Sequence, residues 1–250
     1  MTALPTHPTG DDLRALCRSS PWRWTTLHLV HREVHGEVGG KERPGGDTEA
    51  WVVRPGWTRW VRGDASGVAT GVPYSHVTMS IGAGAPAIEP GPGLSPQEVE
   101  PERRDDGLVL TRPDRVGPRW VDYDDPMVGS FRWVAMLDPE ELATGVAMSD
   151  VRVEQRDGRT TWAATMRPHD GYLPRCGGDC CELLPSVAGL FSEGEENVPH
   201  DWQERVYPEA FDVAVDVATG VVVRVRELGG ATPGAGFEND LLAVDAAVER

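Results

Sequence analysis

Two histidines with a carboxylate between them are the first candidates for chemistry in this sequence, since His31 and His35 flank Glu33. Helical zinc-protease motifs place the glutamate directly beside one histidine, and they require a helix so that both imidazoles share a face. Here the glutamate is central, and the β-branched residues around it predict a strand, in which residues four apart lie about 13 Å from one another. In a helix, His28, His31 and His35 would instead lie close together on one face. We therefore expect half-exposed histidines on a strand, not a shared metal ion.

Three cysteines in the run Cys176-Gly177-Gly178-Asp179-Cys180-Cys181 form the second candidate. As reduced thiols they would sit in a loop, but they could also hold a metal ion or form a disulfide from Cys176 to Cys180 or Cys181. A disulfide between the adjacent pair would be strained. A structural zinc site needs four ligands, and the fourth would have to come from His169, Asp179, His200 or Cys17.

Three carboxylates in Asp122-Tyr123-Asp124-Asp125 could bind a hard cation. The spacing does not match an EF-hand loop, and no glycine stands at the required place. The run precedes Pro126, so a solvated turn is the simpler interpretation.

Tryptophan is abundant beside only four Phe and four Tyr. On a sheet that curls without closing, such large rings either fill the core or line a cavity for an apolar ligand. Our candidates for a ligand-binding concave face are Trp51, Trp60 and Trp162. The nine tryptophans are Trp22, Trp24, Trp51, Trp57, Trp60, Trp120, Trp133, Trp162 and Trp202.

The elements that would position these groups are mostly strands joined as hairpins. The strongest pattern is Ala210–Leu228, where β-branched residues alternate on both sides of a turn ending in Gly220. We expect Phe211, Val213, Val215, Val221, Val223 and Val225 to face inward and Asp212, Asp216, Arg224 and Arg226 to face outward. The other predicted strands are 22–35, 48–53, 58–62, one or two within 68–81, the hairpin 151–167 and a closing strand 237–248.

Two short helices and one long loop complete the expected organisation. Residues 11–18 are predicted to form a helix capped by Asp11 or Asp12, and Asp138 is predicted to cap a second helix that ends near Ala143. Residues 82–106 are rich in Pro, Gly and Glu and predict a loop. We therefore expect a single domain over residues 1–250, mainly β (α+β), with a curved antiparallel sheet forming an incomplete barrel and short helices covering its open side.

Charge and composition exclude some partners. The formal net charge is -16, and Lys41 is the one lysine among 24 Lys and Arg residues. Such an acidic chain repels phosphate backbones, so we expect no nucleic-acid partner. The start of the sequence has no basic region followed by an apolar run, and no apolar run approaches the roughly 20 residues of a membrane span. We expect a cytoplasmic protein with reduced cysteines and no membrane insertion.

The hairpin also carries a resemblance. FDVAVDVATGVVVRVRELGG followed by GFENDLLAVDAAV resembles the C-terminal part of LolA-like lipoprotein carriers and sigma-regulator-type sensors, and EAWVVRPGWTRW resembles their early hairpin, with Arg54, Pro55, Gly56 and Arg59 at the matching positions. The resemblance implies an incomplete antiparallel barrel plugged by helices, with an apolar cavity between. Members of this group bind lipoprotein acyl chains or sense proteins in the envelope.

The sequence therefore suggests a protein without catalytic activity or cofactor that holds an apolar small molecule or a protein segment in the concave face of a half-barrel. No nucleophile-elbow, P-loop or dinucleotide-binding motif is present to suggest an enzyme. The alternatives are a thiol or metal protein that uses Cys176, Cys180 and Cys181, and a structural interaction partner.

Overall fold

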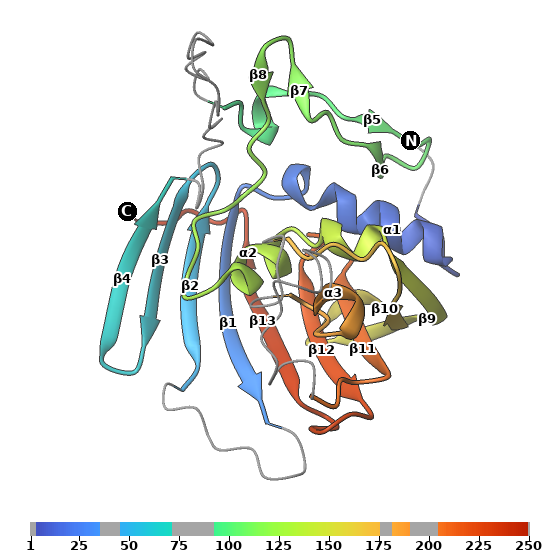
Figure 1. Cartoon of the computed structure of the whole chain (residues 1–250). Helices are drawn as coiled ribbons and strands as arrows, with labels where there is room; N and C mark the ends of the chain where they lie inside the picture. The colour runs from blue at the N-terminus through green and yellow to red at the C-terminus, as the bar shows by residue number, and fades with distance from the viewer. Residues whose placement is uncertain (1–3, 36–45, 72–92, 176–181, 191–204, 250) are drawn as a thin grey trace, which may run out of the picture.

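A nine-stranded antiparallel sheet forms the body of the computed structural model, which describes residues 4–35, 46–71, 93–175, 182–190 and 205–249. The strand order is β4-β3-β2-β1-β13-β12-β11-β10-β9, so the first and last strands of the chain pair in the interior of the sheet (Figure 1). The strands are β1 Thr26–Val34, β2 Thr48–Val53, β3 Trp57–Arg62, β4 Ala65–Thr70, β9 Val146–Arg156, β10 Arg159–Pro168, β11 Ala210–Asp216, β12 Val222–Leu228 and β13 Gly236–Val244.

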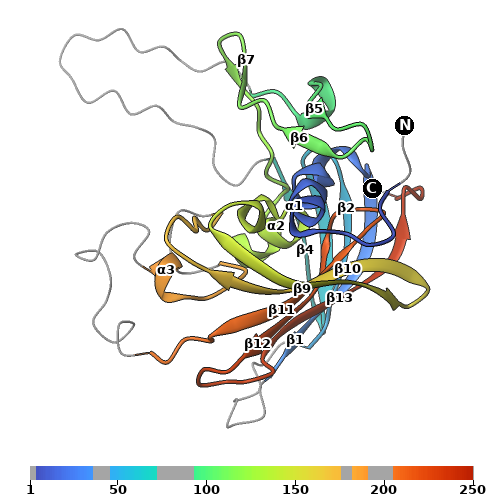
Figure 2. The same ribbon diagram turned by 90° about the vertical axis from the view of Figure 1, so that its right-hand side faces the viewer.

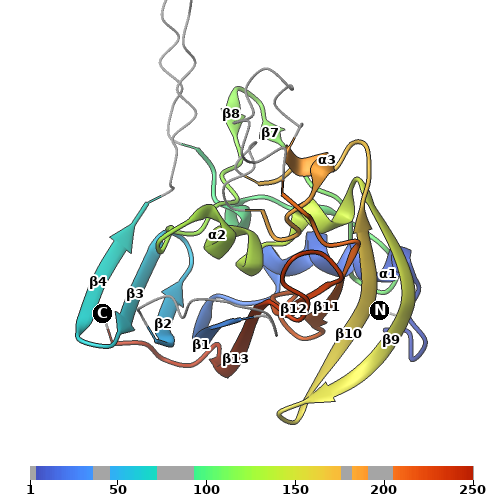
Figure 3. The ribbon, with the colours of Figure 1, turned by 60° about the horizontal axis from the view of Figure 1, so that its bottom comes forward.

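The sheet curls around its helices without closing. Figure 3 shows it running from β4 on the left, through β13 at the bottom, to β9 on the right, with helices inside the concavity. Leu13, Leu16 and Met136 project from these helices and are fully buried in the core that the strands enclose. The predicted incomplete barrel covered by short helices is therefore confirmed. The covering elements are α1 Gly10–Ser19, η1 Ser20–Trp22, α2 Phe131–Leu137, η3 Glu140–Ala143 and α3 Val187–Leu190.

Helix α1 begins at a capping box. The Thr9 hydroxyl accepts a hydrogen bond from the Asp12 N–H at 3.3 Å, and the Asp12 carboxylate accepts one from the Thr9 N–H at 2.8 Å. Both groups satisfy backbone donors that a helix start leaves without partners. The predicted helix is confirmed, but its cap is Thr9 because Asp12 already stands at the third helical position.

Across the described residues, no helix is long and apolar enough to cross a membrane.

The β11–β12 hairpin decides which residues face the core. Most of the residues predicted to face inward are buried in the main core, namely Phe211, Val213, Val215, Val221 and Val225. The register shifts between Ala214 and Val215, so that Val215 pairs with Val222 and Val223 becomes an extra residue in the strand. Val223 therefore turns to the outer face and packs against alanines of β10 and β11. The prediction that it faces inward is wrong, because sequence alternation does not reveal a β-bulge.

Residues 93–120 contain small elements that no sequence pattern predicted. They form two short hairpins, β5–β6 and β7–β8, which lie above α1 (Figures 1 and 2). The described part of the predicted loop, residues 93–106, contains η2 and β5, and the strand predicted within 68–81 ends with β4 at Thr70. The remainder of both predictions lies outside the described residues. The elements are η2 Pro96–Glu98, β5 Glu102–Arg103, β6 Val109–Thr111, β7 Arg115–Val116 and β8 Arg119–Trp120.

Helix α2 was missed, and the role predicted for Asp138 is wrong. Asp138 follows the last residue of α2, and the short 3-10 helix after it starts at Glu140 with no side-chain cap. The Asp138 carboxylate is fully buried and binds arginines instead of backbone N–H groups. An Asp directly before a Pro is the usual pattern of a helix start, which explains the prediction. The arginines that Asp138 binds instead lie far away in the sequence, so the local pattern does not reveal them.

Candidate functional site

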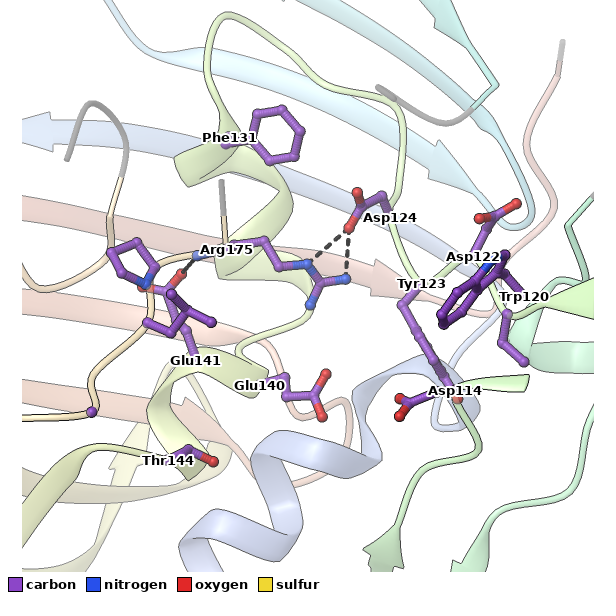
Figure 4. A pocket seen from close by; sticks show the side chains of 14 residues that line it. Asp114, Trp120, Asp122, Tyr123, Asp124, Phe131, Glu140, Glu141, Thr144 and Arg175 are labelled. Carbon is purple, nitrogen blue, oxygen red and sulfur yellow. Dashed lines mark hydrogen bonds and ion pairs between the residues drawn. The ribbon is translucent and has the colours of Figure 1, made fainter. Parts of the chain in front are cut away.

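A pocket of about 610 Å³ lies between the β7–β8 hairpin and the helical cover. We call it the hairpin pocket, and Figure 4 shows its side chains coming from several separate segments. Part of the run that sequence analysis considered for a cation, Asp122 to Asp124, forms one wall. The lining residues are Asp114, Trp120, Val121, Asp122, Tyr123, Asp124, Phe131, Glu140, Glu141, Thr144, Gly171, Leu173, Pro174 and Arg175.

The wall formed by residues 121–124 is held in place by a buried ion pair of the next residue, Asp125. Arg54 follows β2, and its guanidinium donates to both oxygens of Asp125 at 2.7–3.1 Å. The same guanidinium donates to the Ser20 carbonyl at 2.7 Å and lies 3.4 Å from the centre of the Trp24 ring. Arg54 belongs to the Arg-Pro-Gly segment of the family resemblance, so this segment anchors the pocket wall to the sheet and to the end of α1.

A second buried network joins the pocket to α1 and α2. Arg175 donates to Asp124 at 2.8 Å and to Asp138 at 2.8 Å, as its place beside Asp124 in Figure 4 illustrates. Arg112 donates to the other side of Asp138 and, at 2.9 Å, to Glu140. Buried charges are tolerated only when they are paired and hydrogen-bonded, as these are. The carboxylates of Asp124 and Asp125 are therefore bound by arginines, which makes the run a set of anchors and not a cation site.

The electrostatics of the network follow from burial and pairing. Burial alone would raise the pKa of Asp138, but Arg112 and Arg175 outweigh it and hold the pKa below its ordinary value of 3.8. Burial raises the pKa of Glu141 even though its carboxylate accepts hydrogen bonds from the Tyr172 hydroxyl and two backbone N–H groups. The network therefore holds Asp138 as a firmly ionised carboxylate, whereas Glu141, in the pocket lining, resists ionisation.

Aromatic and aliphatic groups supply the accessible walls. Leu173 is 60% exposed, and Trp120 and Tyr123 are half-buried. Tyr123 is fixed by a hydrogen bond from its hydroxyl to the Pro113 carbonyl at 2.9 Å, and burial raises its pKa so that it stays a neutral phenol. The Arg115 guanidinium lies 3.6 Å from the centre of the Trp120 ring. These rings are held in place by contacts with the protein and still border the pocket.

The three tryptophans predicted for the concave face have different surroundings. Trp162 points into the concavity but is only 2% exposed and fully enclosed by the core. Trp60 shares this face, pairs with Gly67 of β4 and packs partly against the core. Trp51 pairs with His28, on the opposite face from the neighbouring core residue Ala50. The prediction that Trp51 lines the concave face is therefore wrong, because strand alternation directs it outward.

The predicted strand over the histidine segment is confirmed as β1, but His31 is buried and not half-exposed as expected. His28 stacks on Trp51 on the outer face, with ring centres 4.7 Å apart, and bonds Glu49 at 2.8 Å. His31 points inward and bonds Asn239 at 2.8 Å. Among the described residues, no group of three or more His, Cys, Asp or Glu side chains is arranged to hold a metal ion.

The cysteine candidates Cys176, Cys180 and Cys181 lie outside the described residues, directly after Arg175 in the sequence. Cys17 is described: it lies on the buried face of α1, and burial raises the pKa of its thiol to about 12. A thiol with such a pKa is almost entirely protonated at neutral pH and is a poor nucleophile.

A smaller pocket, of about 280 Å³, opens where β1, β12 and β13 meet residues 183–185. Its apolar members Phe211, Val225 and Phe237 belong to the concave wall, but each is at most 2% exposed. The groups that a ligand could touch there are mainly polar, such as Glu33 and Glu227. The hairpin pocket is therefore the better site for an apolar ligand.

Sequence reasoning did not find the hairpin pocket. The one available signal was the acidic run Asp122–Asp125, which contains Tyr123 and closely follows Trp120. It was interpreted as a turn because the arginines that bind it, Arg54 and Arg175, are far away in the sequence.

Neither a protein-family model nor a curated protein matches the sequence. Among solved structures, the chain is similar to the lipoprotein LppX of Mycobacterium tuberculosis, with 14% sequence identity over 95% of this chain and 97% of that one. The TM-score is 0.36, which does not by itself establish a common fold. The half-barrel assignment accordingly rests on the strand order and on the helices inside the sheet.

Proposed function

We propose that this chain is a non-enzymatic binding protein and that its ligand places an apolar portion in the hairpin pocket. The observation that carries the proposal is the pocket's set of accessible apolar surfaces, since Leu173 is 60% exposed and Trp120 and Tyr123 border the same space. Removing such surfaces from water by binding a ligand is favourable, at about 25 cal/mol for each Å² buried.

The size of the pocket suits a small molecule. Ligand sites in proteins are typically clefts of about 300–1,000 Å³ with mostly apolar walls and a few fixed polar groups. The hairpin pocket, at about 610 Å³, falls within this range. This volume favours the small-molecule version of the sequence-based hypothesis over a bound protein segment.

The walls are also fixed before a ligand arrives. Arg54 holds the 121–125 segment through Asp125, and Arg175 joins Asp124 to Asp138. A binding site that is already ordered loses less conformational entropy when it is occupied. The buried arginine pairs thus support the binding proposal.

The pocket chemistry favours binding over catalysis. Glu141, the pocket carboxyl group whose pKa burial raises, is 6% exposed, and both of its oxygens accept hydrogen bonds from the protein. A general acid or base must reach the proton that it transfers, which this group does not do in the described arrangement. Arg175 and Asp124, which also line the pocket, are paired with each other, and this pairing likewise favours a structural role over proton transfer.

Titration with a neutral apolar fluorophore, N-phenylnaphthylamine, tests the proposal. We expect saturable binding with one site per chain. Leu173→Ser should raise the Kd about three- to tenfold, since it removes one exposed apolar wall. Leu242→Ser is the matched control, because Leu242 is also well exposed, at 54%, but lies on β13 outside the pocket.

Two results would refute the proposal: no saturable fluorescence change with the unmodified protein, or equal Kd values for Leu173→Ser and the unmodified protein. Circular dichroism melting of both variants verifies that each remains folded, which we expect because both leucines are exposed.

A further inference from the structure

Carboxylates dominate the charge of the hairpin pocket. Asp114, Asp122, Asp124 and Glu140 line it together with a single guanidinium, that of Arg175. Glu141 is left out of the count because its pKa is raised. When Asp138, Arg112 and Arg115, which contact these groups, are included, five carboxylates face three guanidinium groups, so negative charge is in excess. Such a pocket concentrates cations and repels anions.

The positive charge of Arg175 is already neutralised. Its guanidinium contacts Asp124 at 2.7 Å and Asp138 at 2.8 Å, so two carboxylates face one cation. The side chain of Arg175 is 12% exposed, which leaves little of it for a ligand. Arg175 therefore acts as part of the wall, and a bound anion would gain little from it.

Two carboxylates remain available to a ligand. Asp114 is exposed, and its carboxylate has no hydrogen-bond or ion-pair partner among the described side chains. Glu140 binds Arg112 through one oxygen and keeps its side chain 42% exposed. Figure 4 shows Asp114, Tyr123, Glu140 and Arg175 around the same central space. A cation placed there would contact an unneutralised carboxylate from the β7–β8 side and a second one from η3.

The aromatic rings of the pocket already bind cations of the protein itself. The Arg115 guanidinium lies over Trp120 at 3.6 Å, and Arg112 lies over Tyr123 at 5.0 Å. Both distances are within the roughly 6 Å at which a ring face attracts a cation. Because these guanidinium groups cover the ring faces, the groups left to recognise a ligand cation are Asp114 and Glu140, and the rings supply apolar surface beside them.

We propose that the ligand of the hairpin pocket is an amphiphilic amine, with a cationic ammonium group between Asp114 and Glu140 and an apolar body against Tyr123 and Leu173. This inference rests on the binding function proposed above and specifies its ligand class. It narrows the apolar small molecule expected from the sequence to one that also carries a positive charge, because the pocket combines apolar walls with excess negative charge.

Three competitors that share one alkyl chain test the inference. An alkyltrimethylammonium ion, the corresponding alcohol and the corresponding carboxylate would each displace N-phenylnaphthylamine, below their micelle-forming concentrations. We expect the ammonium ion to bind at least about tenfold more tightly than the alcohol, and the carboxylate more weakly than either. Equal affinity of the ammonium ion and the alcohol, or tighter binding of the carboxylate, would overturn the inference and leave the binding function intact. Failure of the fluorophore itself to bind would instead refute the function.

A charge-neutral variant identifies the group that recognises the cation. Asp114→Asn should weaken ammonium binding about three- to tenfold and leave alcohol binding unchanged. Asp64→Asn, in the exposed β3–β4 turn, is the matched control and should change neither affinity. Added salt should weaken binding of the ammonium ion and not of the alcohol. An Asp114→Asn protein that binds the ammonium ion as tightly as the unmodified chain contradicts the proposal.

Discussion

The concavity of the half-barrel and the hairpin pocket use aromatic side chains in opposite ways. Inside the concavity, Trp162 is 2% exposed and is enclosed by residues of the strands and helices. In the hairpin pocket, Trp120 is half-buried and borders open space. In the proposed binding mode, the ligand therefore does not lie between the sheet and the helices. Here the helices fill that space, and the accessible apolar surface lies on the other side of the cover.

The two regions also differ in how they are held together. The concavity is stabilised by packing of apolar side chains, whereas the pocket is framed by the arginine pairs of Asp125 and Asp138. Around Trp162, such packing leaves little space for a ligand, because protein interiors are as dense as organic crystals. A frame of ion pairs can instead surround open space. The variants below test this contrast, from the largest expected effect to the smallest.

Removing Trp162 should cost the most stability. Trp162→Ala leaves a cavity in the core and should lower the free energy of unfolding by about 3–5 kcal/mol, measured by chemical denaturation. Trp120→Ala is the matched control and should cost less than about 1 kcal/mol, because the ring is half-exposed and little buried surface is lost. Similar losses for both variants would contradict the contrast between a filled concavity and an open pocket.

Breaking the pocket frame should come next. Asp138→Asn leaves Arg112 and Arg175 buried without their shared carboxylate, so we expect a loss of about 3 kcal/mol in unfolding free energy. Asp212→Asn provides the comparison, because Asp212 pairs with Arg152 and Arg224 on the outer face of the sheet and is 23% exposed. It should cost about 1 kcal/mol or less. A smaller loss for Asp138→Asn than for Asp212→Asn would show that the frame does not depend on the buried pairs.

Acid should weaken the frame as well. The pKa of Asp138 is below its ordinary value of 3.8, because Arg112 and Arg175 outweigh the effect of burial. The unfolded chain therefore binds a proton at this carboxyl group before the folded chain does, so the stability that it contributes is present above pH 3.8 and is lost as the pH falls through the folded pKa. We would measure the unfolding free energy by chemical denaturation at several pH values between about 5 and 2. It should fall less steeply with decreasing pH for Asp138→Asn than for the unmodified protein. Equal slopes would contradict this account.

Trp51 should matter least. It stacks on His28 on the outer face of the sheet, away from both the concavity and the hairpin pocket. Trp51→Ala should therefore lower the unfolding free energy by about 1 kcal/mol or less and leave the Kd for N-phenylnaphthylamine unchanged. Weaker fluorophore binding by this variant would place the ligand on the outer face.

The sheet was predictable from the sequence because its signal is local. Strand-forming residues and turn signals predicted β1, β2, β3 and the β9–β10 hairpin, and period-two alternation predicted the β11–β12 hairpin. The bulge at Val223 was missed because alternation does not reveal an extra residue. The two small hairpins within residues 93–120 were missed because strands of two or three residues have no period to detect.

The candidate site was not predictable in the same way. Its frame depends on Arg54, Arg112 and Arg175. The Arg-Pro-Gly segment marked Arg54 as part of a hairpin and not as a partner of Asp125, and no sequence pattern marked Arg112 or Arg175. The carboxylate partners of the three arginines are 71, 26 and 51 positions away in the sequence. Pairing over such distances depends on the fold and not on local propensity.

The position of the ligand is the central claim, and one paired titration tests it most directly. N-phenylnaphthylamine would be titrated into Trp120→Ala, which alters the hairpin pocket, and into Trp60→Ala, which alters the concave face of the sheet. We expect a Kd about tenfold higher for Trp120→Ala and an unchanged Kd for Trp60→Ala. Weaker binding by Trp60→Ala together with an unchanged Kd for Trp120→Ala would place the ligand in the concavity and contradict the account.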